Sequence, residues 1–100
     1  MVVMILESVP LSLRGELTRW LIEPSPGVFV GHVSARVRER LWEKALEARG
    51  AGGVIQIWST NTEQRFRMRM EGIKRRKVVE LEGIQLVAVA LPEEDEQAAR

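Results

Sequence analysis

An acidic residue and a group of cations are the side chains of this sequence that could do chemistry. Glu7 directly follows the apolar, β-branched run 2–6, which predicts a buried central strand that ends at the acid. A carboxylate at such a strand end could act as a Mg²⁺ ligand or a general base. One carboxylate holds Mg²⁺ poorly, but a two-fold axis could bring two together. The alternative is a hydrogen-bonding or capping acid beside the loop 8–12.

The cations are concentrated in one stretch of the chain. Residues 65–77 hold seven bases and one acid, although the net charge of the whole chain is only +1. Arg65, Arg67 and Arg69 alternate with apolar residues, which predicts a strand with arginine on one face. A basic loop follows, made of Lys74, Arg75, Arg76 and Lys77. This density favours binding of an anion or a nucleic acid, with a solvated edge strand as the alternative.

The other catalytic residue types are scarce. The chain has no Cys, which excludes a disulfide framework, a Cys-ligated zinc site and a thiol nucleophile. Its one histidine, His32, is expected to be a surface or partly buried residue. Few of the five aromatic residues lie among the bases, which argues for contacts to a nucleic-acid backbone and against base stacking. About six phosphate contacts in a dimer would give a log–log salt dependence with a slope of roughly −5.

Hydrophobic periodicity predicts two helices. The first has Ser12 as its candidate N-cap, ends before Pro24, and buries residues at helical spacing. Those residues are Leu13, Leu17, Trp20 and Leu21. The second is expected to start at the N-cap Ser34 and to close at Gly50. Its buried stripe comprises Val37, Leu41, Ala45 and Ala48.

Apolar or alternating runs predict strands around 2–6, 28–30, 54–58, 65–70, 78–81 and 84–91. The order β-α-β-α-β-β-β favours an α+β fold with one mainly antiparallel sheet and two helices on one face. The last strand could be an ordinary core strand or could pair with the sheet edge of another chain. Residues 1–92 are expected to form one domain and residues 93–100 an acidic, mobile tail. We expect a cytoplasmic protein without membrane contact, because no apolar run is long enough to cross a bilayer.

Several separated blocks of the sequence resemble one known family. They are residues 13–21 (LRGELTRWL), 27–35 (GVFVGHVSA), 41–43 (LWE), 60–63 (TNTE) and the pair Arg75-Arg76. Over residues 2–92 the chain resembles the type I-E form of the CRISPR-associated "protein two", the small dimeric subunit of the spacer-acquisition complex. The agreement of several blocks in order and spacing makes a chance match a poor explanation.

The resemblance implies a ferredoxin-like sandwich whose C-terminal strand is exchanged in a homodimer. That dimer would bridge two dimers of the CRISPR integrase subunit and hold the protospacer double-stranded DNA. Arg75 and Arg76 match the family's arginine pair on the DNA backbone, and Arg14 matches another basic contact. A further family base is replaced here by Ser12. The segment that meets the integrase matches the apolar residues Ile84, Leu86, Val87, Val89 and Leu91.

The wider family also includes metal-dependent nucleases that cut RNA or duplex DNA. They use an Asp from each subunit at the end of the first strand, where this chain has Glu7, as is usual for the type I-E branch. Glu is one methylene longer, so a Mg²⁺ geometry tuned for Asp need not survive. We therefore expect a DNA-binding adaptor that is not catalytic in spacer integration. The alternatives are a Mg²⁺-dependent endonuclease that uses Glu7 and a module that binds only protein.

Overall fold

The computed structural model describes residues 1–91 of the chain. Its elements in order are β1 Val2–Leu6, α1 Leu11–Thr18, β2 Ile22–Ser25, β3 Val28–Gly31, α2 Ala35–Ala48, β4 Val54–Ser59, β5 Phe66–Glu71, β6 Arg76–Leu81 and β7 Ile84–Val89. The predicted acidic tail, residues 93–100, lies outside the described residues.

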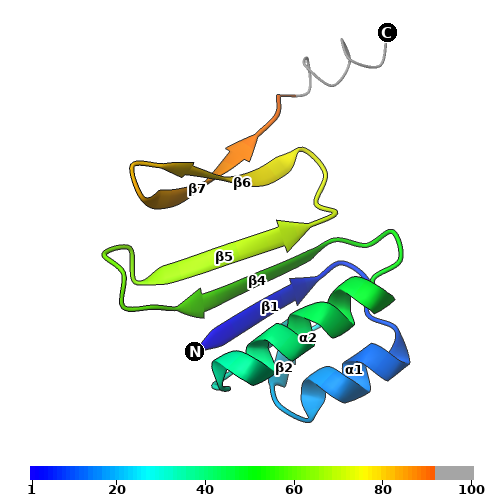
Figure 1. Ribbon diagram of the computed structural model, residues 1–100. Helices are drawn as coiled ribbons and strands as arrows, with labels where there is room; N and C mark the ends of the chain where they lie inside the picture. Colours follow the sequence, from blue (N-terminus) through cyan, green and yellow to red (C-terminus); the bar gives the residue numbers. More distant parts are fainter. Residues whose placement is uncertain (92–100) are drawn as a thin grey trace, which may run out of the picture.

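Five strands form one antiparallel sheet in the order β2-β3-β1-β4-β5, and both helices cover the same face of it (Figure 1). In the segment from β1 to β4, the strands β1 and β2 run in the same direction with β3 between them. This split βαβ arrangement is that of a ferredoxin-like fold. The predicted α+β class with two helices on one face is confirmed, and β5 adds a strand at the β4 edge.

The prediction for the first helix and the strand after it was partly wrong. Helix α1 ends at Thr18, and β2 contains Pro24, which had indicated a helix end and no strand. A proline is tolerated here because β2 is an edge strand. Trp20 lies beyond the helix and is 46% exposed, not buried as predicted. Ser12 lies inside the helix, and Pro10 occupies the N-cap position without a side-chain hydrogen bond.

The core lies between the helices and the sheet. It consists of Val2, Met4, Leu6, Leu13, Leu17, Leu21, Phe29, Leu41, Ala45 and Val54. The second helix is placed as predicted: the Ser34 hydroxyl accepts a hydrogen bond from the Val37 amide at 3.2 Å. Gly50 follows the helix with φ +59°, a left-handed conformation that favours glycine. Val37 and Ala48 pack against the buried core, which confirms the predicted stripe.

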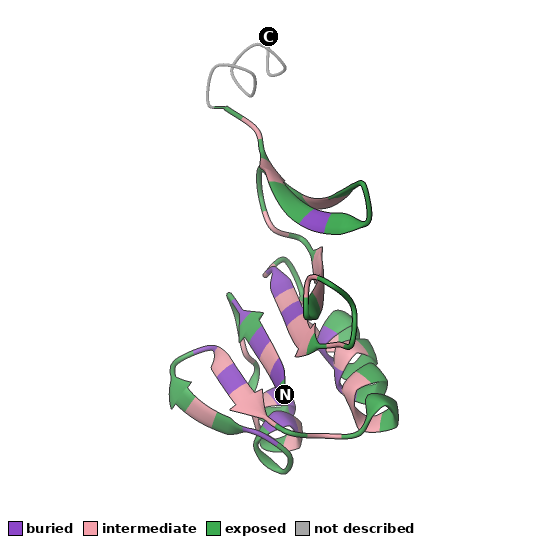
Figure 2. Cartoon of the chain, turned by 90° about the vertical axis from the view of Figure 1, so that its left-hand side faces the viewer, coloured by how far each residue is buried: buried purple, intermediate pink, exposed green. Residues whose placement is uncertain are grey.

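The opposite face of the five-stranded sheet is apolar and carries no helix of residues 1–91 (Figure 2). We call it the open sheet face; its residues are Val3, Ile5, Val28, Val30, Ile55, Ile57, Phe66, Met68 and Met70. Strand register places Ile5 between Val28 and Ile55, and Met70 beyond Ile55. None of the nine side chains is fully buried. Alternate residues of β1, β3, β4 and β5 contribute to this face, because successive side chains of a strand point to opposite faces of the sheet. The sheet therefore has one face filled by the core and one apolar face that no helix of residues 1–91 covers.

The last two strands form a separate hairpin. The sequence predicted a single sheet, but β6 and β7 pair only with each other in a two-stranded antiparallel sheet. The predicted last strand also ends earlier, at Val89. Period and hydrophobicity do not specify which sheet edge a strand joins, so this partition needed the tertiary structure.

Two glutamines hold the hairpin against the outer edge of β5. The Gln85 side chain accepts from the Met68 amide at 2.7 Å and donates to the Met68 carbonyl at 3.0 Å. The Gln64 side chain in turn bonds both backbone groups of Gln85, at 2.7 and 2.8 Å. Gln85 is 6% exposed, and its amide replaces the backbone partner that an adjacent strand would supply to β5. We call this arrangement the glutamine clamp.

Replacing Gln85 by alanine is expected to loosen the hairpin. The substitution leaves the Met68 backbone groups without their partner, which costs about 2 kcal/mol of docking free energy. That cost corresponds to roughly thirtyfold faster hydrogen exchange at the Met68 amide, with the amide of the core residue Met4 unchanged. The matched control is Leu86→Ala, because Leu86 is a neighbouring hairpin residue that is 45% exposed. Equal exchange at Met68 in wild type and Gln85→Ala would contradict the clamp.

Candidate nucleic-acid interface

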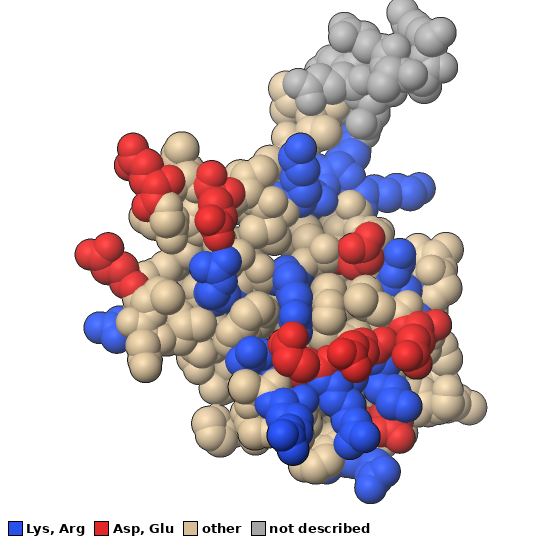
Figure 3. All heavy atoms as spheres, in the orientation of Figure 1, with Lys and Arg blue, Asp and Glu red and all other residues tan. Residues whose placement is uncertain are grey.

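Four consecutive cations lie where β5 leads into the hairpin. Lys74 and Arg75 form a turn, and Arg76 and Lys77 are the first residues of β6, so the predicted basic loop is half strand. We call these four residues the basic cluster. Arg75 has φ +61°, which turns the chain tightly enough to bring the cations together. Figure 3 shows Lys and Arg atoms gathered beside the hairpin, whereas over the helices blue atoms alternate with red ones.

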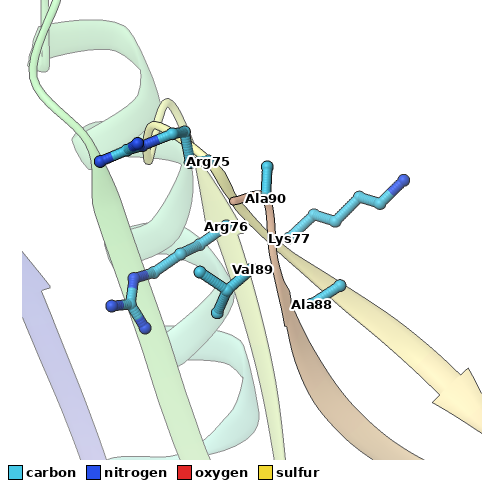
Figure 4. A pocket seen from close by; sticks show the side chains of 6 residues that line it. All are labelled: Arg75, Arg76, Lys77, Ala88, Val89 and Ala90. Atoms are coloured by element: carbon cyan, nitrogen blue, oxygen red, sulfur yellow. The ribbon is translucent and has the colours of Figure 1, made fainter. Parts of the chain in front are cut away.

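The cluster borders an open hollow of about 460 Å³. Arg75, Arg76 and Lys77 line one part of it, and Ala88, Val89 and Ala90 line the rest (Figure 4). Arg75 and Arg76 extend to one side of the hairpin and Lys77 extends to the other. Small apolar side chains and long cations suit a ligand with a charged, irregular outline, such as a sugar-phosphate backbone.

Three of the four charges of the cluster have no carboxylate partner within residues 1–91. No Asp or Glu in that range lies within ion-pair distance of Lys74, Arg76 or Lys77. Like charges at adjacent positions repel one another, so an anion that bridges them is favoured. The arrangement can hold phosphate groups by charge-assisted hydrogen bonds.

The arginines of β5 have carboxylate partners within residues 1–91. Arg67 donates to Glu80 at 2.7 Å, and Arg69 contacts both carboxylate oxygens of Glu39, at 2.6 and 3.1 Å. Apart from Arg65, which precedes β5, the bases of the predicted stretch 65–77 therefore divide into the paired Arg67 and Arg69 on β5 and the basic cluster. The period-2 pattern predicted β5 correctly, but the arginine face is turned toward α2.

Arg69 is held in a slot between two tryptophans. Its guanidinium carbon lies 4.6 Å from the ring centre of Trp42 and 5.1 Å from that of Trp58. The fully buried Gln56 accepts from Arg69 at 2.6 Å and donates to the Arg38 carbonyl at 3.0 Å. Stacking and hydrogen bonds together fix this guanidinium as a structural link between sheet and helix.

The same contacts act on the acid that faces Arg69. The hydrogen bond from Arg69 holds the pKa of Glu39 below its ordinary value against the opposing effect of desolvation, with a smaller contribution from Arg38. Glu39 is therefore ionised at neutral pH, and its carboxylate forms an ion pair with the Arg69 guanidinium. Sequence reasoning missed this group, because Glu39, Gln56 and Arg69 lie on three separate elements.

Arg14, predicted as a DNA contact, has an intramolecular partner. It donates to Glu23 at 3.0 and 3.3 Å, and Glu23 also accepts from the Gly27 amide at 3.0 Å. The Gly27 hydrogen bond and the Arg14 hydrogen bond lower the pKa of Glu23. Helix α1 and the hairpin lie at opposite ends of the molecule (Figure 1), so one copy does not bring Arg14 to the basic cluster.

Glu7 follows the central strand β1, as predicted, and is bound to the loop before β4. Its side chain accepts from the Gly53 amide at 2.6 Å, and its own amide donates to the Gly53 carbonyl at 3.0 Å. A Cβ at Gly53 would lie 2.6 Å from the Glu7 carboxylate oxygen, so this close approach requires glycine. The hydrogen-bonding alternative thus describes Glu7 within one chain, although its partner is Gly53 and not the loop 8–12.

A comparison with known protein families matches most of this chain to one family. The family described as CRISPR-associated protein (Cas_Cas2CT1978) matches residues 1–86. The chain belongs to this CRISPR-associated family. Its match covers the whole five-stranded sheet, both helices, the basic cluster and the first half of β7.

The nuclease alternative for this CRISPR-associated protein requires Mg²⁺ at Glu7. Within residues 1–91, no group of three or more His, Cys, Asp or Glu side chains is arranged to hold a metal ion. One Glu7 oxygen already accepts from Gly53, and Mg²⁺ requires a nearly octahedral set of oxygens. The residues of a single copy therefore do not fit the ion. A site built from the Glu7 of two copies stays a prediction.

The apolar residues predicted to meet the integrase lie on the surface of this CRISPR-associated protein. Ile84, Leu86, Val87, Val89 and Leu91 are all exposed. Within β7 only Gln85 is buried, so of the two alternatives for the last strand, the ordinary core strand does not describe β7 within residues 1–91. An exposed row of apolar side chains typically marks a contact with another molecule. Neither helix in residues 1–91 has the length and apolar character needed to span a bilayer.

Proposed function

We propose that this CRISPR-associated protein is of the type I-E form and acts as a DNA-binding adaptor in spacer acquisition. In this role a homodimer holds the protospacer duplex and bridges dimers of the integrase subunit. The observation that carries the proposal is the basic cluster: four cations, of which three have no carboxylate partner within residues 1–91. Contacts of such cations with phosphates bind duplex DNA without regard to sequence.

The open sheet face supports the homodimer. Nine apolar side chains on four strands form a patch that a second sheet could cover, as in a two-sheet sandwich. A second copy of the chain supplies an identical, self-complementary face through a two-fold axis. Dimerisation would also double the number of basic clusters on one particle. Two clusters on a rigid dimer suit a straight duplex, which presents phosphates at regular intervals.

The exposed row on β7 and Leu91 supports contact with the integrase subunit. The β7 residues of this row are apolar and exposed on both faces of the strand: Ile84 and Leu86 lie on one face, and Val87 and Val89 lie on the face of Gln85. Burial of five such side chains in a partner surface would remove several hundred square ångströms of apolar area from water, on the order of the core of a small interface. None of these side chains belongs to the buried core of residues 1–91.

Glu7→Gln is expected to leave in vitro spacer integration within about twofold of wild type, because an adaptor needs no carboxylate there. Glutamine keeps the oxygen that accepts from the Gly53 amide, so the loop is preserved. The assay combines purified chain, its cognate integrase, a protospacer duplex and a repeat-containing target. The control is Arg75→Ala with Arg76→Ala, which is expected to abolish integration.

Loss of integration in Glu7→Gln, with dimer and complex intact, would replace the adaptor by the second candidate. That candidate is a Mg²⁺-dependent endonuclease with Glu7 from each of two copies, and it is favoured by the position of Glu7 at the end of the central strand. The nuclease requires that EDTA and Glu7→Gln each stop cleavage of nucleic acid by the purified protein.

A further inference from the structure

Glu7, Gly53 and Gly72 lie in one row at an end of the five-stranded sheet. Each is one position beyond the last register pairs that join β1 to β4 and β4 to β5. The basic cluster begins at Lys74, two positions after Gly72, where the chain leaves β5 for the hairpin (Figure 1). The end of the sheet that carries Glu7 is therefore also the end from which the chain enters the basic cluster.

Glu7 and Ile73 share the space in which a side chain of Gly53 would lie. The Glu7 carboxylate accepts from the Gly53 amide at 2.6 Å. A Cβ at Gly53 would also meet the tip of the Ile73 side chain, and it would lie 3.0 Å from the Gly72 carbonyl oxygen. Gly53 itself is buried. Glu7 is thus connected to Gly72 and Ile73 through a single buried residue.

Arg49, directly after α2, contacts the same segment of the chain. Its guanidinium donates to the Gly52 carbonyl at 3.0 Å and lies where a side chain of Gly72 would project. Gly72 has φ +73° and Arg75 has φ +61°, so two left-handed residues lie within four positions. The left-handed conformation of an arginine persists only where surrounding contacts hold it. The path of residues 72–75 therefore depends on the packing around Gly52 and Gly72.

From these contacts we infer that Glu7 is a positioning residue for the basic cluster. Its side chain holds Gly53 in place and thereby fixes residues 72–75, which present the four cations as one preformed surface. A preformed surface binds phosphates with a smaller ordering cost than a mobile one. The inference rests on the proposed binding of duplex DNA, whereas the effect of Glu7 on residues 72–75 does not.

The charge and the hydrogen bond of Glu7 act on DNA binding with opposite signs. A carboxylate repels phosphates, so loss of the charge alone should leave duplex affinity equal to that of wild type or up to about twofold tighter. Loss of the hydrogen bond as well releases residues 72–75, and the cost of ordering them again should weaken binding about tenfold. The number of phosphate contacts stays the same, so the log–log salt slope should remain roughly −5.

The test compares Glu7→Gln, which keeps the acceptor oxygen, with Glu7→Ala, which removes it. The matched control is Glu71→Ala, because Glu71 is an exposed acid at the same end of the sheet and its ion pair with Arg49 is long, at 4.0 Å. Fluorescence anisotropy of a labelled duplex over a salt series gives the affinity and the slope. We expect about tenfold weaker binding for Glu7→Ala alone, with the other two variants within about twofold of wild type.

A second measurement follows residues 72–75 in the absence of DNA. Backbone order parameters from ¹⁵N relaxation report motion on the picosecond to nanosecond timescale. We expect values of about 0.85 at the amides of residues 73–75 in wild type and Glu7→Gln, and values below about 0.6 in Glu7→Ala. The amide of the buried Met4 should keep the same value in every protein, which shows that the core is intact.

The two measurements separate the positioning role from the proposed function. Lower order in Glu7→Ala, with no duplex binding even by wild type, would retain the effect on residues 72–75 and reject the DNA-binding function. Equal duplex affinity of wild type and Glu7→Ala, or rigid residues 73–75 in Glu7→Ala, would reject the positioning role. An equal loss of affinity in Glu7→Gln and Glu7→Ala would also reject it, because the charge and not the hydrogen bond would then matter. Weaker binding by Glu7→Ala alone, with mobile residues 73–75 and an unchanged slope, would support both claims.

Discussion

Replacement of Arg75 and Arg76 by alanine is expected to weaken binding of duplex DNA about 100-fold at low salt. The two side chains border the same hollow and extend to the same side of the hairpin, so one backbone segment could contact both. A dimer would lose four phosphate contacts, and each contact contributes about −0.9 to the log–log salt slope. The slope should therefore change from roughly −5 to roughly −1.5. Fluorescence anisotropy over a salt series measures both quantities.

The control for this variant removes the same charge from another surface. Arg36 and Arg40 are exposed on α2, where alanine preserves the helix. We expect Arg36→Ala with Arg40→Ala to change duplex affinity by no more than about threefold. An equal loss of affinity and slope in both double variants would show that only net charge matters. An unchanged slope in the Arg75 and Arg76 variant would place the DNA elsewhere on the protein.

The elements that the sequence predicted well are those with strong local signals. Helix α2 combines an apolar stripe with the cap at Ser34, and β5 has a clear period of two. Strand β2 was missed because Pro24 is an unfavourable strand residue, and its place at the sheet edge is a property of the tertiary structure. The separate hairpin was missed for a related reason. The side chain that docks it, Gln85, is one polar residue in an apolar run, and its partner Met68 lies seventeen positions earlier.

The candidate site shows the same division between local and long-range information. The basic cluster is contiguous in sequence, so composition alone located it. The partners of the Arg69 side chain are distant in sequence: they are Glu39, thirty residues away, and two tryptophans on other elements. A polar residue in the apolar strand 54–58, Gln56, was the available signal for a buried network. Arg14 likewise forms an ion pair with Glu23, which lies in a segment that the sequence analysis had assigned to the end of the first helix.

Ile5→Glu is expected to convert the proposed homodimer to a folded monomer. Ile5 is 36% exposed in the middle of the open sheet face, with Val28 and Ile55 beside it. A carboxylate there would be buried without a partner in a face-to-face dimer, which should weaken association about 1,000-fold. The fold should persist, because Ile5 points away from the core formed with the helices. Sedimentation velocity gives the oligomeric state, and circular dichroism confirms the fold.

The monomer that results from Ile5→Glu also tests how the two surfaces work together. A monomer keeps one basic cluster, so its salt slope for duplex DNA should be about half that of the dimer. Leu11→Glu is the matched control, since Leu11 is 83% exposed on α1 and lies far from the open sheet face; it should leave the dimer intact. A dimer that survives Ile5→Glu would place the interface on another surface, and the open sheet face would then have to be covered by a different chain. A halved slope would instead link the apolar face to DNA binding, because pairing two sheets is what brings two basic clusters onto one duplex.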